Sequence, residues 1–291
     1  MAQEKYIVDN YPYAIGKDID GNVGYIKDAQ DIVFSIVLEI DRICRKNNIP
    51  YALAFGSALG IYNYQGFIPW DDDADIAIDY FDIEKLKDAL EKDLSPEFEF
   101  SCYEKDDRYN VLLPTFKVRK RVAYMRDKNY RLWQDHTEGY EGFFVDIVAF
   151  MGMRNKTRHF WHIFKSQIQM VFYFISDYIF RHDPKGMKKG IKKRENKLAN
   201  LYKDEKYVCQ STILPFQIAK VNLYPREVIY PFKEYTFRGA KLYSFNDVEE
   251  FSRIRFGNKS LKVEKDGEMV DLLPQKKRTA LHIKEFSFKK K

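Results

Sequence analysis

Apolar residues recur at helical spacing near the start of the chain and in short runs after it. Across residues 28–47 they fall close to every third or fourth position, which predicts a helix that packs on a core and ends at Asn47-Asn48, before Pro50. Shorter apolar runs predict strands at residues 51–55, 74–80, 98–103, 115–124 and 142–150. Helical periodicity predicts short helices at residues 57–64, capped by Ser57, and 82–92, capped by its first residue.

This alternation of strands and helices predicts one α/β core over about residues 48–150, within a domain that spans residues 28–260. Residues 156–206 have a mostly helical pattern, and we interpret them as an insertion into that domain. Residues 1–27, rich in Gly, Asp, Asn and Tyr, are expected to form an irregular arm, and residues 261–291 a basic extension. The chain has 291 residues, 45% of them hydrophobic, which suffices for a sizeable core.

Four aspartates occupy five positions within GFIPWDDDADIAI, residues 66–78. If residues 74–80 form a strand, Ala74, Ile76 and Ile78 face the core, and Asp73 and Asp75 face the other way. The Cα atoms of these two aspartates would lie roughly 6–7 Å apart. Magnesium is typically held by one or two carboxylates together with substrate phosphates, and it would remove the repulsion between these charges. We therefore expect Mg²⁺, or Mn²⁺, at this pair.

Two other interpretations of the acidic segment stay open. Asp71 and Asp72 suit an ordinary polar turn. The spacing of acids at 71, 73 and 75 also matches a calcium loop of the EF-hand type. Such a loop needs Gly at its sixth position, where this chain has Ile76, and Glu at its twelfth, where it has Asp82. The apolar alternation that follows favours a strand instead.

Asp146 interrupts the apolar run GFFVDIVAF, residues 142–150. A charged carboxylate in such a strand is costly unless it is paired or binds a metal. If this strand lies beside residues 74–80, Asp146 would complete the metal site or act as the base that deprotonates an attacking hydroxyl. The alternative is an aspartate that is hydrogen-bonded at a strand end.

Gly56 and Ser57 lie where a predicted strand turns into a predicted helix. A helix N-terminus aims backbone N–H groups and the positive end of its dipole at one point, and glycine lets a phosphate approach the backbone closely. Ser57 would cap the helix or donate to a phosphate oxygen. The position of this turn, ahead of a strand with D-x-D, favours a phosphate.

The strand, the Gly-Ser turn, the helix and the later D-x-D together resemble the nucleotidyltransferase superfamily. More specifically, AFGSALGIYNYQGFIPWDDDADIAI resembles the signature of the LicD family, which includes bacterial phosphorylcholine transferases and the eukaryotic fukutin-related proteins. FFVDIVAF is similar to the family's later strand with one Asp, and FNDVEEFSRIRFGN followed by LLPQKKR is more loosely similar to its closing segment. The resemblance is strong over about residues 28–80 and near Asp146, and weak over 156–230. It implies a nucleotidyltransferase-like mixed sheet core with helices and a helical insertion.

This resemblance implies a metal-dependent transferase of phosphorus-containing groups. Its donor would be a CDP-alcohol, for which choline is our best expectation. Its acceptor would be a hydroxyl on a cell-surface glycan precursor of the teichoic acid, lipopolysaccharide or capsule kind, either free or lipid-linked. Asp71 and Asp72 would be supporting residues. The other positions that match the family's motifs would have these roles: Gly56 and Ser57 for donor phosphates, Asp73 and Asp75 for the metal, and Asp146 for the metal or as base.

The chain departs from the family's usual pattern at two positions. Ser57 stands where the family has Thr, so the hydroxyl is kept. Asn63 stands where the family has Arg, so a cation that would face a phosphate is missing. We expect Lys117 and Arg119, or Arg121, on the basic strand to compensate, unless they are only surface charge. If the alcohol is choline, its ammonium should contact aromatic rings; the candidates are Trp70, Trp133 and Tyr140.

The charge of the chain is uneven. The net charge is +6, and residues 181–206 alone contain ten basic and four acidic residues, which fits either an anionic partner or a solvated helical face. Residues 158–180 would form an interfacial helix in peripheral contact with a membrane, or a buried helix of the insertion. Residues 170–180 are too few to span a bilayer and include Asp177.

Three widely spaced cysteines and the absence of an apolar signal core favour the cytoplasm, at or near the inner face of the membrane. No nucleic-acid partner is expected. Two other functions stay open at this point. One is a nucleotidyltransferase that adds a nucleotide monophosphate to a protein, an RNA or a small molecule with the same carboxylates. The other is a non-enzymatic protein that binds anions or membranes.

Overall fold

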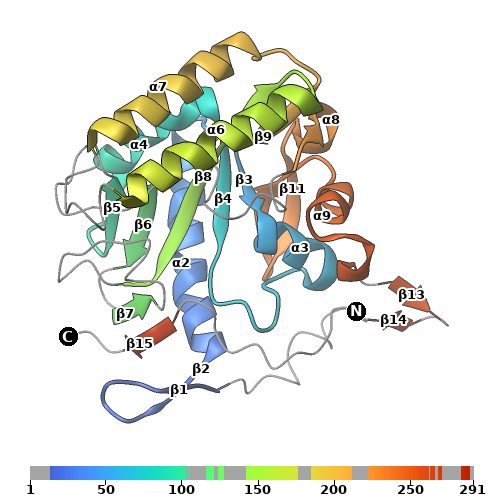
Figure 1. The fold of residues 1–291 in the computed structure, drawn as a ribbon. Helices are drawn as coiled ribbons and strands as arrows, with labels where there is room; N and C mark the ends of the chain where they lie inside the picture. The colour runs from blue at the N-terminus through green and yellow to red at the C-terminus, as the bar shows by residue number, and fades with distance from the viewer. Residues whose placement is uncertain are drawn as a thin grey trace.

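The computed structural model describes residues 14–102, 104, 116–120, 124–127, 142–175, 185–211, 222–261, 263–265, 268–270 and 283–288. Within these residues the chain has a mixed α/β fold built on one large sheet (Figure 1). This confirms the predicted fold class, with parallel and antiparallel strands side by side.

Nine strands form this sheet, and β4 and β8 lie near its middle. β4 pairs with β8 in parallel and with β3 in antiparallel orientation. β8 is long enough to pair also with β6, at its start, and with β9, at its end. The strands in sheet order are β10 (Tyr224–Pro225), β9 (Tyr207–Gln210), β8 (Phe144–Met153), β4 (Asp75–Asp79), β3 (Tyr51–Ala54), β12 (Ala240–Ser244) and β11 (Lys233–Phe237), with β6 (Phe116–Lys120) and β5 (Phe98–Cys102) attached to β8 off this path.

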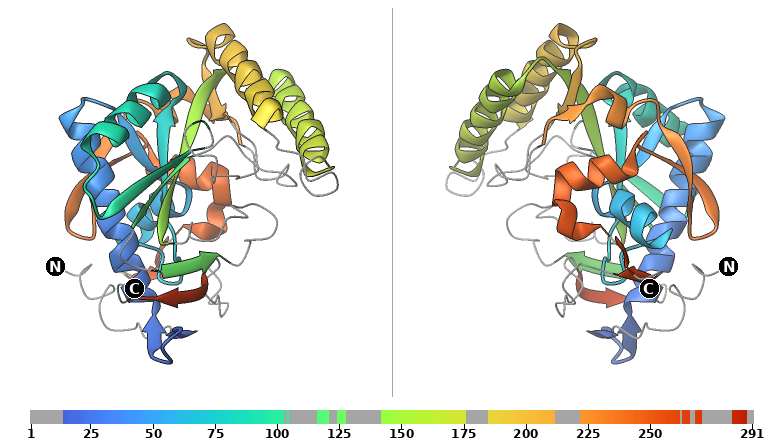
Figure 2. Two further views of the ribbon diagram at one scale, coloured as in Figure 1. Left: turned by 90° about the vertical axis from the view of Figure 1, so that its left-hand side faces the viewer. Right: turned by 90° about the vertical axis from the view of Figure 1, so that its right-hand side faces the viewer.

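Helices cover both faces of the sheet (Figure 2). α2 (Ile26–Lys46) and α4 (Ile83–Asp93) pack on one face. α3 (Phe55–Tyr64), α8 (Arg226–Ile229) and α9 (Val248–Phe256) pack on the other. β4 alternates between the two cores as its sequence predicts, because Ile76 and Ile78 are buried in the first and Ala77 in the second.

Two long helices follow β8, as the pattern of residues 156–206 predicts. They are α6 (Lys156–Phe174) and α7 (Lys185–Leu201); residues 176–184, between them, lie outside the described part of the chain. α6 is fixed by its buried side, where His162 Nε2 lies 2.9 Å from the carbonyl oxygen of Ser211 and Ser166 Oγ accepts a hydrogen bond of 2.7 Å from Arg194.

The two ends of the described chain are more ordered than the sequence predicts. Within the expected irregular arm, β1 (Ala14–Lys17) and β2 (Val23–Tyr25) form a hairpin, because the Asp18 carboxylate accepts the backbone N–H groups of Asp20 and Asn22 in the turn. In the expected extension, β15 (Ile283–Ser287) pairs with β7 (Tyr124–Asp127), and β13 (Val263–Lys265) pairs with β14 (Glu268–Val270). Two short 3₁₀ helices complete the elements, η1 (Tyr80–Asp82) and η4 (Asn258–Ser260).

We predict that Gly60→Ala destabilises the fold, because a Cβ at this position of α3 would lie 2.2 Å from the carbonyl oxygen of Gly66. The loss should be about 1–3 kcal/mol in the free energy of unfolding, as for other overpacked sites. Gly190→Ala in α7 is the matched control, since its Cβ would meet nothing within 4 Å; we expect it to be neutral or to stabilise by up to about 1 kcal/mol. Urea unfolding measures both, and equal effects would contradict the close approach.

We also predict that the fold loses stability in mild acid through α6. Burial lowers the pKa of His159 from 6.5 to about 4 and that of His162 to about 3. The unfolded chain therefore binds protons more readily, so the stability from each neutral imidazole is complete above pH 6.5 and falls by roughly 1 kcal/mol per pH unit below it. His159→Leu should make the free energy of unfolding less dependent on pH between 6.5 and 4.5. Parallel curves for the two proteins would refute this.

Candidate functional site

The strands bring two of the predicted site residues side by side. Asp75, the first residue of β4, is the register partner of Asp146 on β8. Neighbouring strands lie about 4.8 Å apart, and paired residues of parallel strands point to the same face. The sequence assigns Asp146 to the site only if its strand lies beside residues 74–80, and β8 does lie beside β4. Ala54, the last residue of β3, lies opposite Asp75 on the other side, so the Gly-Ser turn begins at the same edge of the sheet.

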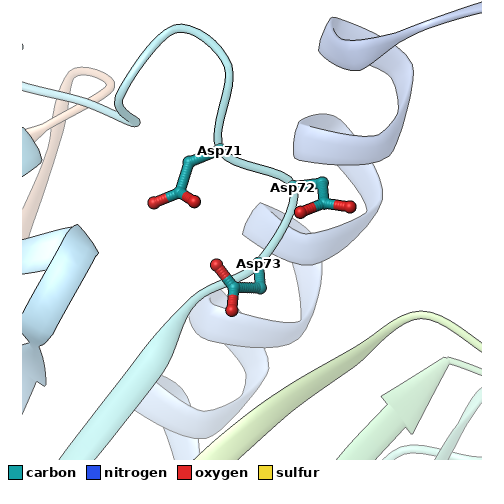
Figure 3. Close-up of side chains that lie close together, drawn as sticks. All are labelled: Asp71, Asp72 and Asp73. Carbon is teal, nitrogen blue, oxygen red and sulfur yellow. The ribbon is translucent and has the colours of Figure 1, made fainter. Parts of the chain in front are cut away.

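A second set of carboxylates lies just before β4. Asp71, Asp72 and Asp73 each offer an oxygen within 4.8 Å of those of the other two. Figure 3 shows the carboxylates of Asp71 and Asp73 on one side of the loop and that of Asp72 on the other, toward α2. Within the described residues, this is the only group of three such side chains, and Asp75 and Asp146 do not belong to it. Asp73 belongs to this loop group, whereas its predicted partners Asp75 and Asp146 lie on β4 and β8. An EF-hand loop over residues 71–82 is excluded, because residues 75–79 within it form the extended strand β4 of the central sheet.

The acidic loop is held from two distant parts of the chain. Gln30 Nε2, on α2, donates hydrogen bonds of 3.1 and 2.8 Å to the carbonyl oxygens of Ile68 and Asp71. The backbone N–H of Ile283, on β15, donates to Asp72 Oδ2 at 3.2 Å. Asp72 is only 3% exposed, so this contact gives it a structural role. Neither holder was predicted, because no local pattern in the sequence marks a contact across 41 or 211 residues.

The turn from β3 into α3 is sharper than the sequence predicts. α3 begins at Phe55, which has a φ of 45°, a left-handed conformation that is strained for an aromatic residue. Rings pack against Phe55 and hold it, with Phe150 at 6.1 Å and Phe251 at 6.3 Å between centroids. The helix therefore starts two residues earlier than expected, and Ala54, without a side-chain acceptor, occupies the N-cap.

The expected cap at Ser57 is wrong, because this residue lies within the first turn of α3. Its side chain is 3% exposed, and its Oγ has no hydrogen-bond partner among the described residues. A Cβ at the neighbouring Gly56 would lie 2.5 Å from Asp71 Oδ2, so a larger residue there would displace this carboxylate. The acidic loop thus lies against the N-terminus of α3, where backbone N–H groups and the helix dipole favour anions.

The basic strand β6 places one cation directly on the site. Lys117 is the register partner of Asp146, and its Nζ lies 2.8 Å from Asp146 Oδ1 and 3.5 Å from the centre of the Phe144 ring. Arg119, two residues on, shares this face and donates to the carbonyl oxygen of Gly142 at 3.4 Å. Lys120 points the other way and donates to Ser35 on α2 at 2.9 Å.

Five further residues from the sequence analysis differ in their outcome. Asn63 is buried and donates from Nδ2 to the carbonyl oxygen of Ser260 at 2.8 Å, so it ties α3 to η4. Trp70 packs beside a small apolar cluster that includes Leu59 and Leu261. Arg121, Trp133 and Tyr140 lie outside the residues that the structure describes.

A pocket of about 490 Å³ lies away from these acids, at the far end of β4. Lys192 in its wall contacts Glu84 and Glu104 at 2.8 Å each. Burial alone would raise the pKa of Glu104, but hydrogen bonds from Lys192 and Lys87 lower it below its usual value. We give the pocket no part in the site, because none of the predicted acids lines it. Its walls are formed by Tyr80, Phe81, Ile83, Glu84, Lys189, Lys192, Lys193 and Asn196.

Among protein families, the chain matches the nucleotidyltransferase domain of LicD/FKTN/FKRP over residues 48–183. No curated protein matches the chain. The family match includes the Gly-Ser turn, the acidic loop, β4, β6 and β8, and it leaves out α2 and the looser resemblance near the C-terminus, which stays a prediction. Among the described residues, no helix is long and apolar enough to cross a membrane. The predicted resemblance is thus confirmed, since residues 48–183 match the nucleotidyltransferase domain of this family.

Proposed function

We propose that this protein is a metal-dependent phosphotransferase that moves a phospho-alcohol, with phosphocholine as the first candidate, from a CDP-activated donor to a hydroxyl of a glycan precursor. The family points to a transferase, and the observation that carries the finer proposal is the pairing of Asp75 with Asp146 beside the acidic loop and the N-terminus of α3. Negative charge gathered next to an anion-binding helix end suits a cation between carboxylates and phosphates.

The residues present fit a divalent cation. Three loop carboxylates have oxygens within 4.8 Å of one another, hard divalent cations prefer such oxygens, and a bound cation would reduce the repulsion between them. Asp73 and Asp75 would hold the ion with Asp146, while Asp71 and Asp72 support the loop. A bound Mg²⁺ or Mn²⁺ would neutralise the charge of the donor phosphates.

The transfer is a substitution at the β-phosphorus of the donor. The acceptor oxygen forms the new P–O bond, the bond from the β-phosphorus to the bridging oxygen breaks, and cytidine monophosphate leaves with that electron pair. The proton of the acceptor hydroxyl passes to the Asp146 carboxylate, whose Oδ1 lies 2.8 Å from Lys117 Nζ. Lys117 orients this carboxylate, and Ser57 Oγ with the first N–H groups of α3 binds the donor phosphates.

A second candidate uses the same residues to transfer a nucleotide monophosphate. It is favoured by the kind of domain that the chain matches, a nucleotidyltransferase domain. The two reactions release different products, since a CDP-alcohol phosphotransferase releases cytidine monophosphate and a nucleotidyltransferase releases pyrophosphate from a nucleoside triphosphate.

The decisive experiment incubates the purified protein and Mg²⁺ with CDP-choline, CDP-ethanolamine, CDP-glycerol or CDP-ribitol, and in parallel with the four nucleoside triphosphates. Release of cytidine monophosphate from one CDP-alcohol, abolished by EDTA, supports the phosphotransferase and identifies the alcohol. Release of pyrophosphate alone supports the second candidate. Turnover of neither set, with acceptor glycans supplied, would favour a protein that only binds anions.

We predict that Asp75→Asn and Asp146→Asn each lower kcat by roughly 100-fold or more, as expected when charge that stabilises a transition state is removed. Asp88→Asn, an exposed aspartate of α4, is the matched control and should keep full activity. Mg²⁺ binding, measured by calorimetry, separates the two roles of Asp146: lost binding identifies a ligand, and binding retained with lost turnover identifies the base. Full activity in either site variant would refute the assignment.

We further predict that Ser57→Ala raises the KM for the donor by roughly 10-fold or more, the cost of one hydrogen bond to a charged phosphate. Ser57→Thr keeps the hydroxyl and should stay near the wild-type value. Ser101→Ala, on β5, removes another buried hydroxyl without a partner among the described residues and should leave KM unchanged. Equal KM values for Ser57→Ala and Ser57→Thr would show that the hydroxyl does not contact the donor.

A further inference from the structure

One side of α6 presents large apolar residues to solvent. They fall within about a third of the helix circumference, at 3.6 residues per turn, and extend over roughly 18 Å along its axis. Other described parts of the chain cover each of these residues only in part. Their exposed fractions are 58% for Phe160, 48% for Trp161, 46% for Phe164, 42% for Ile168, 47% for Val171 and 58% for Phe172.

The opposite side of α6 is buried, so the helix cannot turn this face inward. His162 and Ser166 are 3% and 1% exposed, and both are hydrogen-bonded there to other parts of the chain. On the exposed side the rings pack against one another, with Phe160 and Phe164 stacked at 6.2 Å and Trp161 edge-on to Phe164 at 5.7 Å. An apolar face of this size on a fixed helix marks an interaction site.

The charges around this face are of one sign. α6 contains no Asp or Glu; exposed Arg158 and Lys165 border the apolar face on one side, and Lys156 borders it on the other. Figure 2 shows α7 alongside α6, with both helices standing out from the sheet.

We propose that α6 is an interfacial helix that docks this protein on a lipid bilayer with anionic headgroups, a role that goes beyond the proposed transfer reaction. Aromatic side chains, Trp above all, favour the boundary between acyl chains and headgroups, and flanking Lys and Arg attract anionic lipids. The helix lies in the plane of the membrane surface, with its aromatic face inserted and its His162 side on the protein.

The same charges argue against the other occupants. A second copy placed face to face would bring Arg158 and Lys165 of one chain near the cations of the other, which costs energy at any separation shorter than the screening length. A protein partner would need an apolar groove rimmed with acids. A bilayer with anionic lipid supplies both the apolar layer and the negative charge in one surface.

Vesicle flotation with the full chain tests this proposal without any measurement of activity. We expect co-flotation with vesicles of 70% phosphatidylcholine and 30% phosphatidylglycerol, and at least ~10-fold weaker binding to pure phosphatidylcholine. Phe160→Ser with Phe164→Ser should lower binding to anionic vesicles at least ~10-fold. Leu38→Ser, an exposed apolar residue of α2 on the other side of the sheet, is the matched control and should bind as wild type.

A charge pair completes the test. Arg158→Glu with Lys165→Glu should weaken binding to anionic vesicles, whereas Lys92→Glu, at an exposed position of α4, should not. Unchanged circular dichroism spectra would show that the variants fold. If α6 inserts into the bilayer, brominated lipid should quench the fluorescence of Trp161. Failure of the wild type to float would overturn the proposal, as would a dimer that Phe160→Ser with Phe164→Ser makes monomeric, since that face would then join two copies.

Discussion

The parallel register of β4 and β8 is the constraint on which the candidate site depends. It sets Asp75 and Asp146 side by side at one edge of the sheet, and the antiparallel pairing of β6 then sets Lys117 opposite Asp146. A shift of one residue in either pairing would turn one carboxylate to the other face of the sheet. The burial of Ile76 and Ile78 in one core and of Ala77 in the other opposes such a shift.

Three of the acids at this edge have different surroundings. Asp146 has the ammonium of Lys117, Asp72 has the backbone N–H of Ile283, and Asp71 lies against Gly56 at the start of α3. The fold can therefore concentrate carboxylates without unfolding itself. The strained turn at Phe55 belongs to the same arrangement, because it starts α3 where its N-terminus meets the loop.

Local sequence patterns were sufficient to predict α2, α4, β3 and β4 within two residues at each end, since apolar periodicity reports which side of each element is buried; β8 runs three residues beyond its predicted end. They also singled out Asp73, Asp75 and Asp146. They failed where the outcome depended on partners far along the chain: Ser57 as a cap, the order at residues 14–25, and the contacts of Gln30 and Ile283 with the acidic loop. A hydroxyl that serves a ligand and one that caps a helix look the same in sequence.

The bond from Ile283 to Asp72 also bears on how the protein is made. The acidic loop is synthesised 211 residues before the strand that holds it. During translation, the central sheet is complete in sequence well before β15 emerges, so a nascent chain would expose Asp72 without its amide donor. The loop would reach its final arrangement only after the ribosome has released this late segment, so assembly of the candidate site waits for residues well beyond the central sheet.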